Sequence, residues 1–233
     1  MRLWLLLFLC PSAVAQDAPE IRWRFGPLEE QIGEGARLRL RPGTIWAGGS
    51  EARRFLEFTG NPPDGGEIGI AGPANMSWFA VVSWRTYASL GFEVARPDSR
   101  RIAEAIKSGA ATANQERGRK GRETLEVLDW TGRPVFDERL GRLEFKLKTQ
   151  ESGGRAVENR FVYLLGRAGV VEVELVTEMG TDTAGFESLL DGVTWRPGEE
   201  YERPTDWKTI WVTGLAAAVA AALGIRLWRQ RGQ

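Results

Sequence analysis

The residue types that carry most enzyme chemistry are missing from this sequence. Histidine is absent from all 233 residues, and the single cysteine, Cys10, lies in an apolar segment near the N-terminus. Without them the chain has no Ser-His-Asp or Cys-His nucleophile, no imidazole-ligated zinc or copper, and no internal disulfide. Carboxylate-based hydrolysis, Ser-Lys chemistry and oxygen-ligated metals are the classes that remain.

Carboxylates are the first candidates, because acid–base hydrolysis needs only two of them at a suitable separation. Three acidic pairs are close in sequence: Glu29-Glu30, Asp64 with Glu67, and Asp137-Glu138. Solvated surface charge is the ordinary explanation of such pairs. For Ser-Lys chemistry, Ser108 adjoins Lys107, but neighbouring residues of a helix point to different faces. We therefore predict no cofactor and no metal site, and the sequence assigns no catalytic residue.

Two further features suggest binding rather than catalysis. The run from Arg117 to Arg122 is strongly basic, and outside the cytoplasm it would suit anionic lipid headgroups or polyanionic envelope sugars. A solvated helix end is the alternative. Tryptophans could stack on a glycan, but Trp78, Trp84 and Trp130 stand beside Val and Leu in strand-like stretches, which favours the core.

The N-terminal segment has the three parts of a secretory signal. Arg2 supplies the basic region, residues 3–10 form a short apolar run, and Ala13-Val14-Ala15 matches an A-x-A cleavage site. The apolar run is about half of the roughly 20 residues that a spanning helix needs. We predict that residues 1–15 are a signal peptide that is removed after Ala15.

The C-terminal segment is predicted to span a membrane once, over residues 207–228. No charge occurs between positions 209 and 225, and no polar face interrupts the segment. Its ends carry residues that suit membrane interfaces: Trp207, Lys208, Trp211, Arg226 and Trp228. Gly214, Ala218 and Ala222 are spaced by four, so they form a candidate face for self-association into a homo-oligomer. An alanine-rich helix also produces this spacing by chance.

Charge sets the orientation of the chain. Arg226, Arg229 and Arg231 favour the cytoplasm, and the signal places the N-terminal domain outside. We therefore predict a single-pass protein of the inner (plasma) membrane, with its domain in the periplasm and residues 229–233 in the cytoplasm. Without the signal, span and tail, 26 basic and 31 acidic residues remain of the 31 and 31 in the chain. A mildly acidic domain has no electrostatic reason to bind nucleic acid.

The exported part is expected to hold one domain, residues 16–197, joined to the span by a linker at 198–206. Its fold class is predicted as α+β, a largely antiparallel sheet with two or three helices on one face. Helices are expected at 50–58, from an N-cap at Asp98 to about residue 118, and at 186–190. Strands are expected at 36–41, 78–85, 92–95, 124–130, 142–148, 160–165, 170–176 and 193–195.

The chain resembles a family of uncharacterised, membrane-anchored bacterial proteins that contain a domain of unknown function. Short stretches spread over most of the exported part carry the resemblance: Gly26-Pro27, Ile32-Gly33, Leu38-Leu40, residues 58–61, Ile68-Gly69 with Trp78, Asn114 with Arg117 and Gly121, Asp129-Trp130 with Pro134 and Asp137, Asn159, Leu165-Gly166-Arg167 and residues 198–201. The chain departs from the family at 96–100, where Arg replaces an acidic cluster, and at Glu144-Phe145. The resemblance supports the topology and implies no established activity.

The candidate partner-binding residues combine the basic run with polar positions of the resemblance: Asn61, Asn114, Arg117, Arg119, Arg122, Asn159 and Arg167. The function that fits best is a non-catalytic binding or envelope-support domain near the membrane, whose partner is an envelope protein or glycan. One alternative is a carboxylate-dependent hydrolase acting on envelope glycans. Another is an assembly or sensing subunit that works through its spanning helix.

Overall fold

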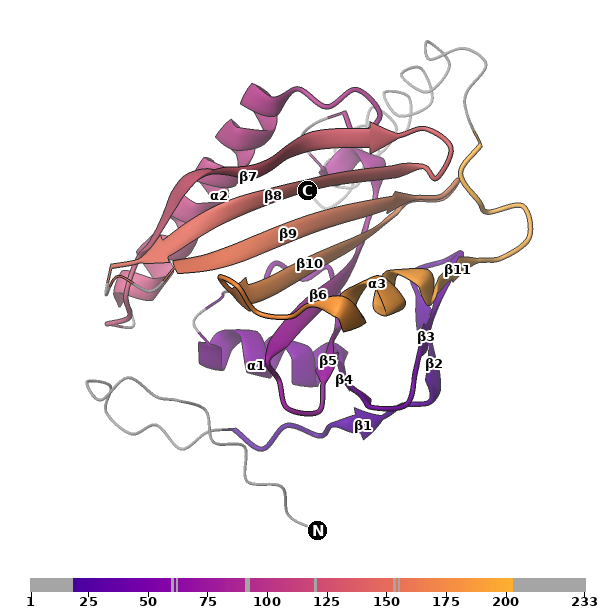
Figure 1. The fold of residues 1–233 in the computed structure, drawn as a ribbon, viewed down its shortest axis with the longest axis horizontal. Coiled ribbons are helices and arrows are strands. Elements are labelled where there is room, and N and C mark those ends of the chain that lie inside the picture. The colour runs from indigo at the N-terminus through magenta and orange to yellow at the C-terminus, as the bar shows by residue number, and fades with distance from the viewer. Residues whose placement is uncertain are drawn as a thin grey trace, which may run out of the picture.

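A computed structural model describes residues 19–59, 61, 63–90, 93–119, 121–152, 154 and 156–202. These residues form an α+β domain with a large antiparallel sheet and three α-helices, which confirms the predicted fold class (Figure 1). The large sheet has the spatial order β1 (Arg24–Phe25), β4 (Thr44–Gly48), β5 (Glu67–Pro73), β6 (Trp78–Arg85), β10 (Val170–Glu178), β9 (Ala156–Leu165), β8 (Arg142–Glu151) and β7 (Leu125–Asp137).

A smaller sheet and the helices complete the domain. The small sheet has the order β11 (Val193–Trp195), β3 (Ala36–Leu40) and β2 (Leu28–Ile32). The helices are α1 (Gly49–Thr59), α2 (Ser99–Arg119) and α3 (Ala184–Asp191), with a 3₁₀ turn, η1 (Tyr87–Ser89). The strands from β7 to β10 follow one another through short turns, and this meander joins the earlier strands where β10 pairs with β6.

Different elements pack on the two faces of the large sheet. On one face α1 packs over Ile70 and Val81, and α2 packs over Phe145 and its neighbours. On the other face α3 and the small sheet enclose the main core, which includes Val173. In Figure 1, α2 lies behind the strands and α3 in front of them. The expectation that all helices lie on one face is therefore wrong, because both faces of β10 are apolar in part and each needs cover.

Most elements lie where the residue pattern predicts them. β3, β6 and β11 match within one residue, and Asp98 caps α2 by accepting hydrogen bonds from the backbone N–H groups of Arg100 and Arg101 at 2.9 and 3.2 Å. The strand expected at 92–95 is wrong. Residues 93–95 form no strand; Val94 instead packs into the core beneath α2 as part of the connection to that helix.

Tryptophans form part of the cores, as their positions in the sequence predict. Trp46 is fully buried, and Trp78 packs edge-on against Phe186 of α3 with ring centroids 6.0 Å apart. Trp130 makes a similar contact with Phe145 at 5.6 Å. These rings contribute to the apolar interior, since each large aromatic side chain buries much surface.

The chain after β11 continues along the domain to the end of the described residues. Residues 198–202 belong to the predicted linker, and here Tyr201 packs edge-on against Phe136 with centroids 6.0 Å apart. Within the part of the chain that the structure describes, no helix is long and apolar enough to cross a membrane. The predicted signal at 1–15, the rest of the linker, the predicted span at 207–228 with its face of Gly214, Ala218 and Ala222, and the tail lie outside the described residues.

Candidate binding face

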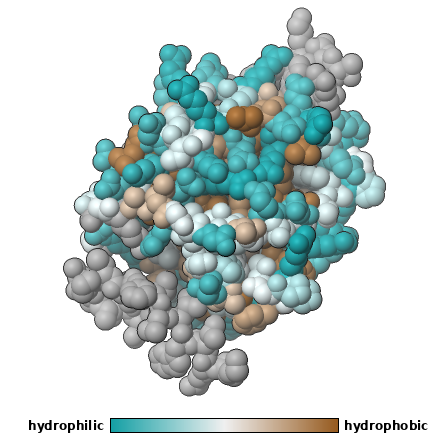
Figure 2. All heavy atoms as spheres, in the orientation of Figure 1, coloured by the Kyte–Doolittle hydropathy of each residue, from teal (hydrophilic) through white to brown (hydrophobic). Residues whose placement is uncertain are grey.

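Charged side chains cover the outer strands of the large sheet on the face that also carries α3. Strand β8 alternates, so that Leu143, Phe145 and Leu147 are buried toward α2 while the residues between them point the other way. α3 packs over the middle of the sheet and leaves the β7–β8 hairpin open on this side. Figure 2 shows hydrophilic residues across the middle of this side of the molecule, with hydrophobic residues among them.

A network of ion pairs holds the inner part of this surface. The Glu144 carboxylate accepts from Nη2 of Arg142 at 2.6 Å and from Nε of Arg160 at 2.7 Å. Glu187 of α3 pairs with Nη1 of Arg160 at 2.5 Å and with Arg142 at 3.7 Å, and the Arg160 guanidinium lies over the Phe186 ring at 5.0 Å. The network therefore fastens α3 to β8 and β9.

The charge of Glu144 is fixed by this network. Burial acts to raise the pKa of the carboxyl, but the hydrogen bonds and positive charges of Arg160 and Arg142 outweigh it and hold the pKa below its ordinary value. The guanidinium of Arg160 is stabilised in turn, because Glu144 and Glu187 more than offset its burial and raise its pKa. Both groups stay charged near neutral pH, and we assign them a structural role.

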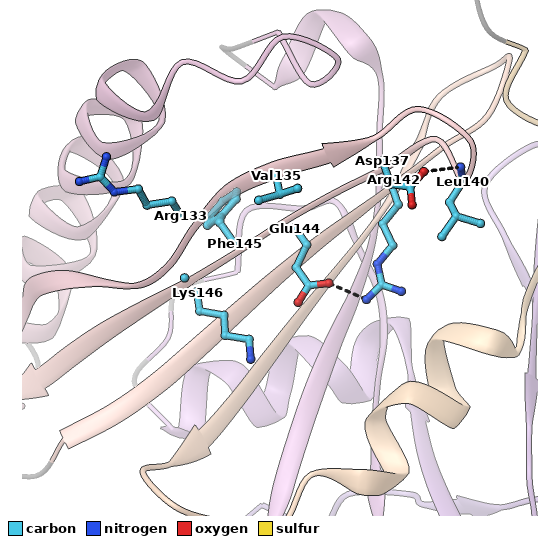
Figure 3. Close-up of a pocket in the computed structure, with 9 residues that line it drawn as sticks. Arg133, Val135, Asp137, Leu140, Arg142, Glu144, Phe145 and Lys146 are labelled. Carbon is cyan, nitrogen blue, oxygen red and sulfur yellow. Dashed lines mark hydrogen bonds and ion pairs between the residues drawn. The ribbon is translucent and has the colours of Figure 1, made fainter.

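Beside this network the surface is hollowed, with a volume of about 380 Å³ (Figure 3). We call this surface the binding face and define it by seven residues that line the hollow: Arg133, Val135, Asp137, Leu140, Arg142, Glu144 and Lys146. Two apolar side chains that line the hollow are exposed to solvent: Val135 has an exposed fraction of 66% and Leu140 of 60%. Arg133 and Lys146 form no ion pair with any of the described residues, whereas Arg142 does.

The turn between β7 and β8 holds the apolar part of the binding face in place. One carboxylate oxygen of Asp137 accepts hydrogen bonds from the backbone N–H groups of Arg139 at 2.8 Å and Leu140 at 3.2 Å. The turn is thus fixed by a side chain, and Leu140 points outward from a rigid backbone. Leu140 and the exposed Val135 together give the hollow an apolar part.

The edge of the sheet next to this surface is protected against strand addition. β7 pairs with β8 only, among the described strands, and its register shifts at three places between Val127 and Val135. Pro134 also has no N–H to donate. Bulges and proline are devices that prevent pairing with another chain. A partner would therefore meet the side chains of the binding face rather than the backbone of β7.

Three of the predicted partner-binding residues lie together at the corner between α2 and β7: Asn114, Arg117 and Arg122. The Asn114 amide accepts from the N–H of Leu125 at 2.8 Å and donates to its carbonyl at 2.7 Å. Arg117 is only 5% exposed and donates to a backbone carbonyl just before β7. Arg122 donates to a backbone carbonyl near the end of α1. Asn114 and Arg117 therefore hold this corner together, and Arg122 connects it to α1.

The other four predicted residues are dispersed. Arg119 is exposed at the end of α2, and Asn159 of β9 donates to Thr149 Oγ1 at 3.1 Å. Arg167 reaches a backbone carbonyl near the end of the described chain at 3.4 Å. Asn61 lines a small cavity on the opposite side of the sheet. The seven residues therefore do not form one site, and their binding role stays a prediction.

Part of the binding face could be recognised from the sequence. Arg142 to Lys148 alternates charged and apolar residues, which predicts a strand with one wet face. The pattern does not reveal that this wet face lies beyond the cover of α3. It also gives no sign that the preceding hairpin turn exposes Leu140.

The fold and the binding face together define a small α+β domain with an open, charged sheet surface. The chain belongs to the family described as Protein of unknown function (DUF2167), whose match covers residues 25–227. This confirms the resemblance to a family with a domain of unknown function. Among solved structures the chain is similar to the solution structure of cyanobacterial PsbP (CyanoP) from Synechocystis sp. PCC 6803. That similarity has 11% identity and a TM-score of 0.47, and covers 80% of this chain and 100% of that one. No curated protein matches this chain.

Proposed function

We propose that the chain is a non-catalytic binding protein of the bacterial envelope, with its domain outside the cytoplasm and its C-terminal segment in the inner membrane. The secretory pattern of residues 1–15 supports export, and the uncharged stretch at 209–225 supports anchoring. The binding face supports the binding role. Within that face, Arg133, Val135, Leu140 and Lys146 take no part in the ion-pair network that fastens α3 to the sheet.

The observation that carries the binding role is the combination of side chains at the hollow. Arg133 and Lys146 have no ion-pair partner among the described residues, and Val135 and Leu140 lie exposed beside them. An isolated exposed leucine needs no explanation, but exposed apolar groups gathered around a hollow mark interaction sites. The neighbouring ion-pair network keeps the backbone beneath them rigid, so little order would be lost on binding.

The partner that fits this chemistry is an acidic segment of an envelope protein that also carries apolar side chains. Arg133 and Lys146 have no ion-pair partner in the described part of the chain, so they favour a ligand with negative charge. Complementary charge increases both specificity and association rate. A hollow of about 380 Å³ accepts a few side chains rather than a whole domain. The bulged edge of β7 excludes addition of a strand, so the segment would lie on the face of the hairpin.

Site-specific photo-crosslinking of the full chain in growing cells tests this proposal. A photoreactive residue at Val135, on the binding face, is expected to give a crosslinked product whose partner peptide is rich in Asp and Glu. The matched control places the same residue at Met179, which is 47% exposed after β10 and lies outside the binding face. Equal crosslinking at both positions would contradict the proposal.

Charge reversal adds a second test of the same surface. Lys146→Glu is expected to reduce the Val135 crosslink by about tenfold, because it removes an attractive charge and adds a repulsive one, together worth on the order of 1.4 kcal/mol or more. Lys107→Glu, at an exposed position of α2 on the other side of the sheet, makes the same change in total charge and should leave the crosslink unchanged. If the yield of the Val135 crosslink is unchanged in Lys146→Glu, the partner does not bind through these cations.

A further inference from the structure

A second polar site lies on the opposite face of the large sheet from the binding face. It is a cavity of about 120 Å³ between α1 and the strands β5, β6 and β10. We call it the acidic cavity, lined by Leu56, Asn61, Asp64, Glu67, Val81, Ser83, Arg85, Glu172 and Glu174. Four of these residues are acidic and one is basic, so the lining is negative overall. The alternation Val-Glu-Val-Glu-Leu in β10 places two of the glutamates on this face.

Three of the four carboxylates already have strong partners. Arg85 binds Asp64 at 2.6 Å through Nη2 and Glu172 at 2.6 Å through Nε. The second oxygen of Glu172 accepts from the Tyr163 hydroxyl at 2.8 Å. Glu67, which is 7% exposed, accepts backbone N–H groups from Asp64 at 2.6 Å and from the next residue at 3.0 Å. These groups build a rigid wall and have little capacity left for a ligand.

Three acceptor groups at the cavity have no donor among the residues that the structure describes. Glu174 lines the cavity, is partly exposed, and has neither a hydrogen bond nor an ion pair with any described residue. The hydroxyl of Ser83, a residue that is 3% exposed, has no partner among these residues either. Asn61 donates its amide to Thr59 Oγ1 at 3.1 Å, and its carbonyl oxygen accepts no hydrogen bond from the described residues. These acceptors face the cavity and are free to bind a ligand that carries several donors.

We propose that the acidic cavity binds a primary alkylammonium group. Such a group has one positive charge and three N–H donors, which match the Glu174 carboxylate, the Ser83 hydroxyl and the Asn61 carbonyl oxygen. The volume of about 120 Å³ equals that of roughly four water molecules at about 30 Å³ each, enough for the ammonium and its first carbons. Leu56 and Val81 line the same cavity and provide apolar contact for those carbons.

Other cations fit this site less well. Within the described ranges no group of three or more His, Cys, Asp or Glu residues is placed to hold a metal ion. The carboxylates of Asp64, Glu67 and Glu172 are turned toward Arg85, Tyr163 and backbone N–H groups instead. A guanidinium is planar with five donors and needs more acceptors than the three that are open.

Binding is expected to be coupled to the loss of a proton. Burial and the nearby charge of Glu172 raise the pKa of Glu174 to about 8, with Asp64 adding to this effect and Arg85 opposing it. The charged and titratable groups around Glu174 are Glu172 on its own strand, Arg85 on β6, Glu67 on β5, Asp64 in the preceding loop and Tyr163 on β9. An ion pair with an ammonium requires the carboxylate, so the protonated form must ionise first.

Calorimetric titration of the full chain in detergent micelles with n-butylammonium tests the proposal. At pH 9 the Glu174 carboxylate is mostly ionised, while an alkylammonium still keeps its proton at a pKa near the 10.4 of lysine. Because only the ionised fraction binds, the affinity should be about tenfold higher at pH 9 than at pH 7. Tetramethylammonium has the same charge but no N–H donor, and it should bind at least tenfold more weakly.

Matched variants assign the binding to this cavity. Glu174→Gln keeps the side-chain shape and should remove both most of the affinity and its pH dependence. Glu57→Gln, at an exposed position of α1, makes the same change outside the cavity and should preserve both. Thermal unfolding of each variant confirms that it is folded. The proposal is wrong if butylammonium fails to bind at pH 9, if tetramethylammonium binds equally well, or if Glu174→Gln binds like the parent.

Two further ligands distinguish the sources of an alkylammonium. Putrescine represents a free polyamine, and N-acetyl-lysine amide represents a lysine side chain of a protein. Stronger binding of putrescine would identify a small-molecule ligand, whereas stronger binding of the lysine derivative would identify a lysine of a partner. Both results support an ammonium site, and neither depends on the binding face, which lies on the other side of the sheet.

Discussion

Glu174 is the residue whose protonation state depends most visibly on its place in the fold. Its strand neighbour Glu172 has Arg85 and Tyr163 as partners, but Glu174 has none among the described residues. Burial removes the solvation that an ionised carboxylate needs, and the charge of Glu172 adds repulsion. The same two glutamates could suggest a catalytic pair, but Glu172 is already bound on both oxygens, so Glu174 would have to act alone.

Replacing Glu174 should therefore change the pH dependence of stability. The folded pKa of about 8 lies above the ordinary 4.5, so the folded state binds the proton more tightly than the unfolded state. This contribution is complete below about pH 4.5 and is lost as the pH rises through 8. Glu174→Gln has no carboxyl at this position and avoids the loss. Its Tm relative to the parent should therefore increase from pH 5 to pH 9, by on the order of 2–4 °C for each kcal/mol of unfolding free energy that the parent loses.

Thermal unfolding of both proteins across this pH range measures the effect. Glu57→Gln on the outer side of α1 is the control, and its difference from the parent should stay constant. If the Tm difference for Glu174→Gln is equally flat, the carboxyl is not protonated in the folded protein at neutral pH.

At the scale of the elements, the Asn114 side chain helps to join α2 to β7. Asn114 makes two hydrogen bonds to the backbone of Leu125, at the first residue of β7. Asn114→Ala removes both and leaves these backbone groups without their partner, so we expect a loss of about 1–3 kcal/mol in the free energy of unfolding. Gln115→Ala, at the next and exposed position of α2, should change stability by less than about 0.5 kcal/mol.

Chemical denaturation measures both variants, and the result also bears on the binding role that the sequence suggests for Asn114. A stable Asn114→Ala protein that had lost a partner would favour that role. A destabilised protein that still gives the Val135 crosslink would assign the residue to the structure.

At the same scale, regular patterns could be recognised in the sequence and irregular ones could not. The alternation in β8 and β10 and the cap at Asp98 predict their elements directly. β5 was not predicted, because its two glycines break the pattern; there Gly69 leaves the space that the Trp46 ring occupies, and a Cβ would lie 2.1 Å from Trp46 Cζ2. The pairing of β10 with β6 joins residues about 90 positions apart, and no local signal specifies it.

The candidate sites depend on this long-range pairing even more than the fold does. Asp64 and Glu67 stand out as an acidic pair in the sequence, but Arg85 and Glu172 reach them only because β6 lies between β5 and β10. Likewise, the outer part of the polar side of β8 stays open because α3 covers the middle of the sheet. Sequence patterns identify which residues are polar, while the topology decides which of them meet.

For the whole molecule, the arrangement of the two proposed sites requires that both faces of the sheet stay accessible. The binding face lies on the side of α3 and the acidic cavity lies on the side of α1. Tyr201, close to the last described residue, packs beside Phe136 at the end of β7, so the chain leaves the domain near the hairpin of the binding face. If residues 207–228 span a membrane, the binding face is held near its surface.

That topology can be tested with reporter fusions to the full chain. An enzyme active only in the cytoplasm and one active only outside it are each fused after Gln233 and after Asp206. Because Arg226, Arg229 and Arg231 follow the uncharged stretch, the fusion after Gln233 should report the cytoplasm. The fusion after Asp206 should report the outside. Replacing the three arginines by glutamine should weaken this preference, whereas Arg53→Gln, Arg54→Gln and Arg100→Gln in the domain should not.

The two outcomes lead to different partners. If the fusions report opposite sides, the acidic partner of the binding face and the ammonium ligand of the acidic cavity must both be sought in the envelope. If both report the cytoplasm, the secretory interpretation of residues 1–15 is wrong and the domain meets cytoplasmic lysines and polyamines instead. The chemistry of the two sites would stand in either case, because it rests on contacts within the folded domain and not on the compartment.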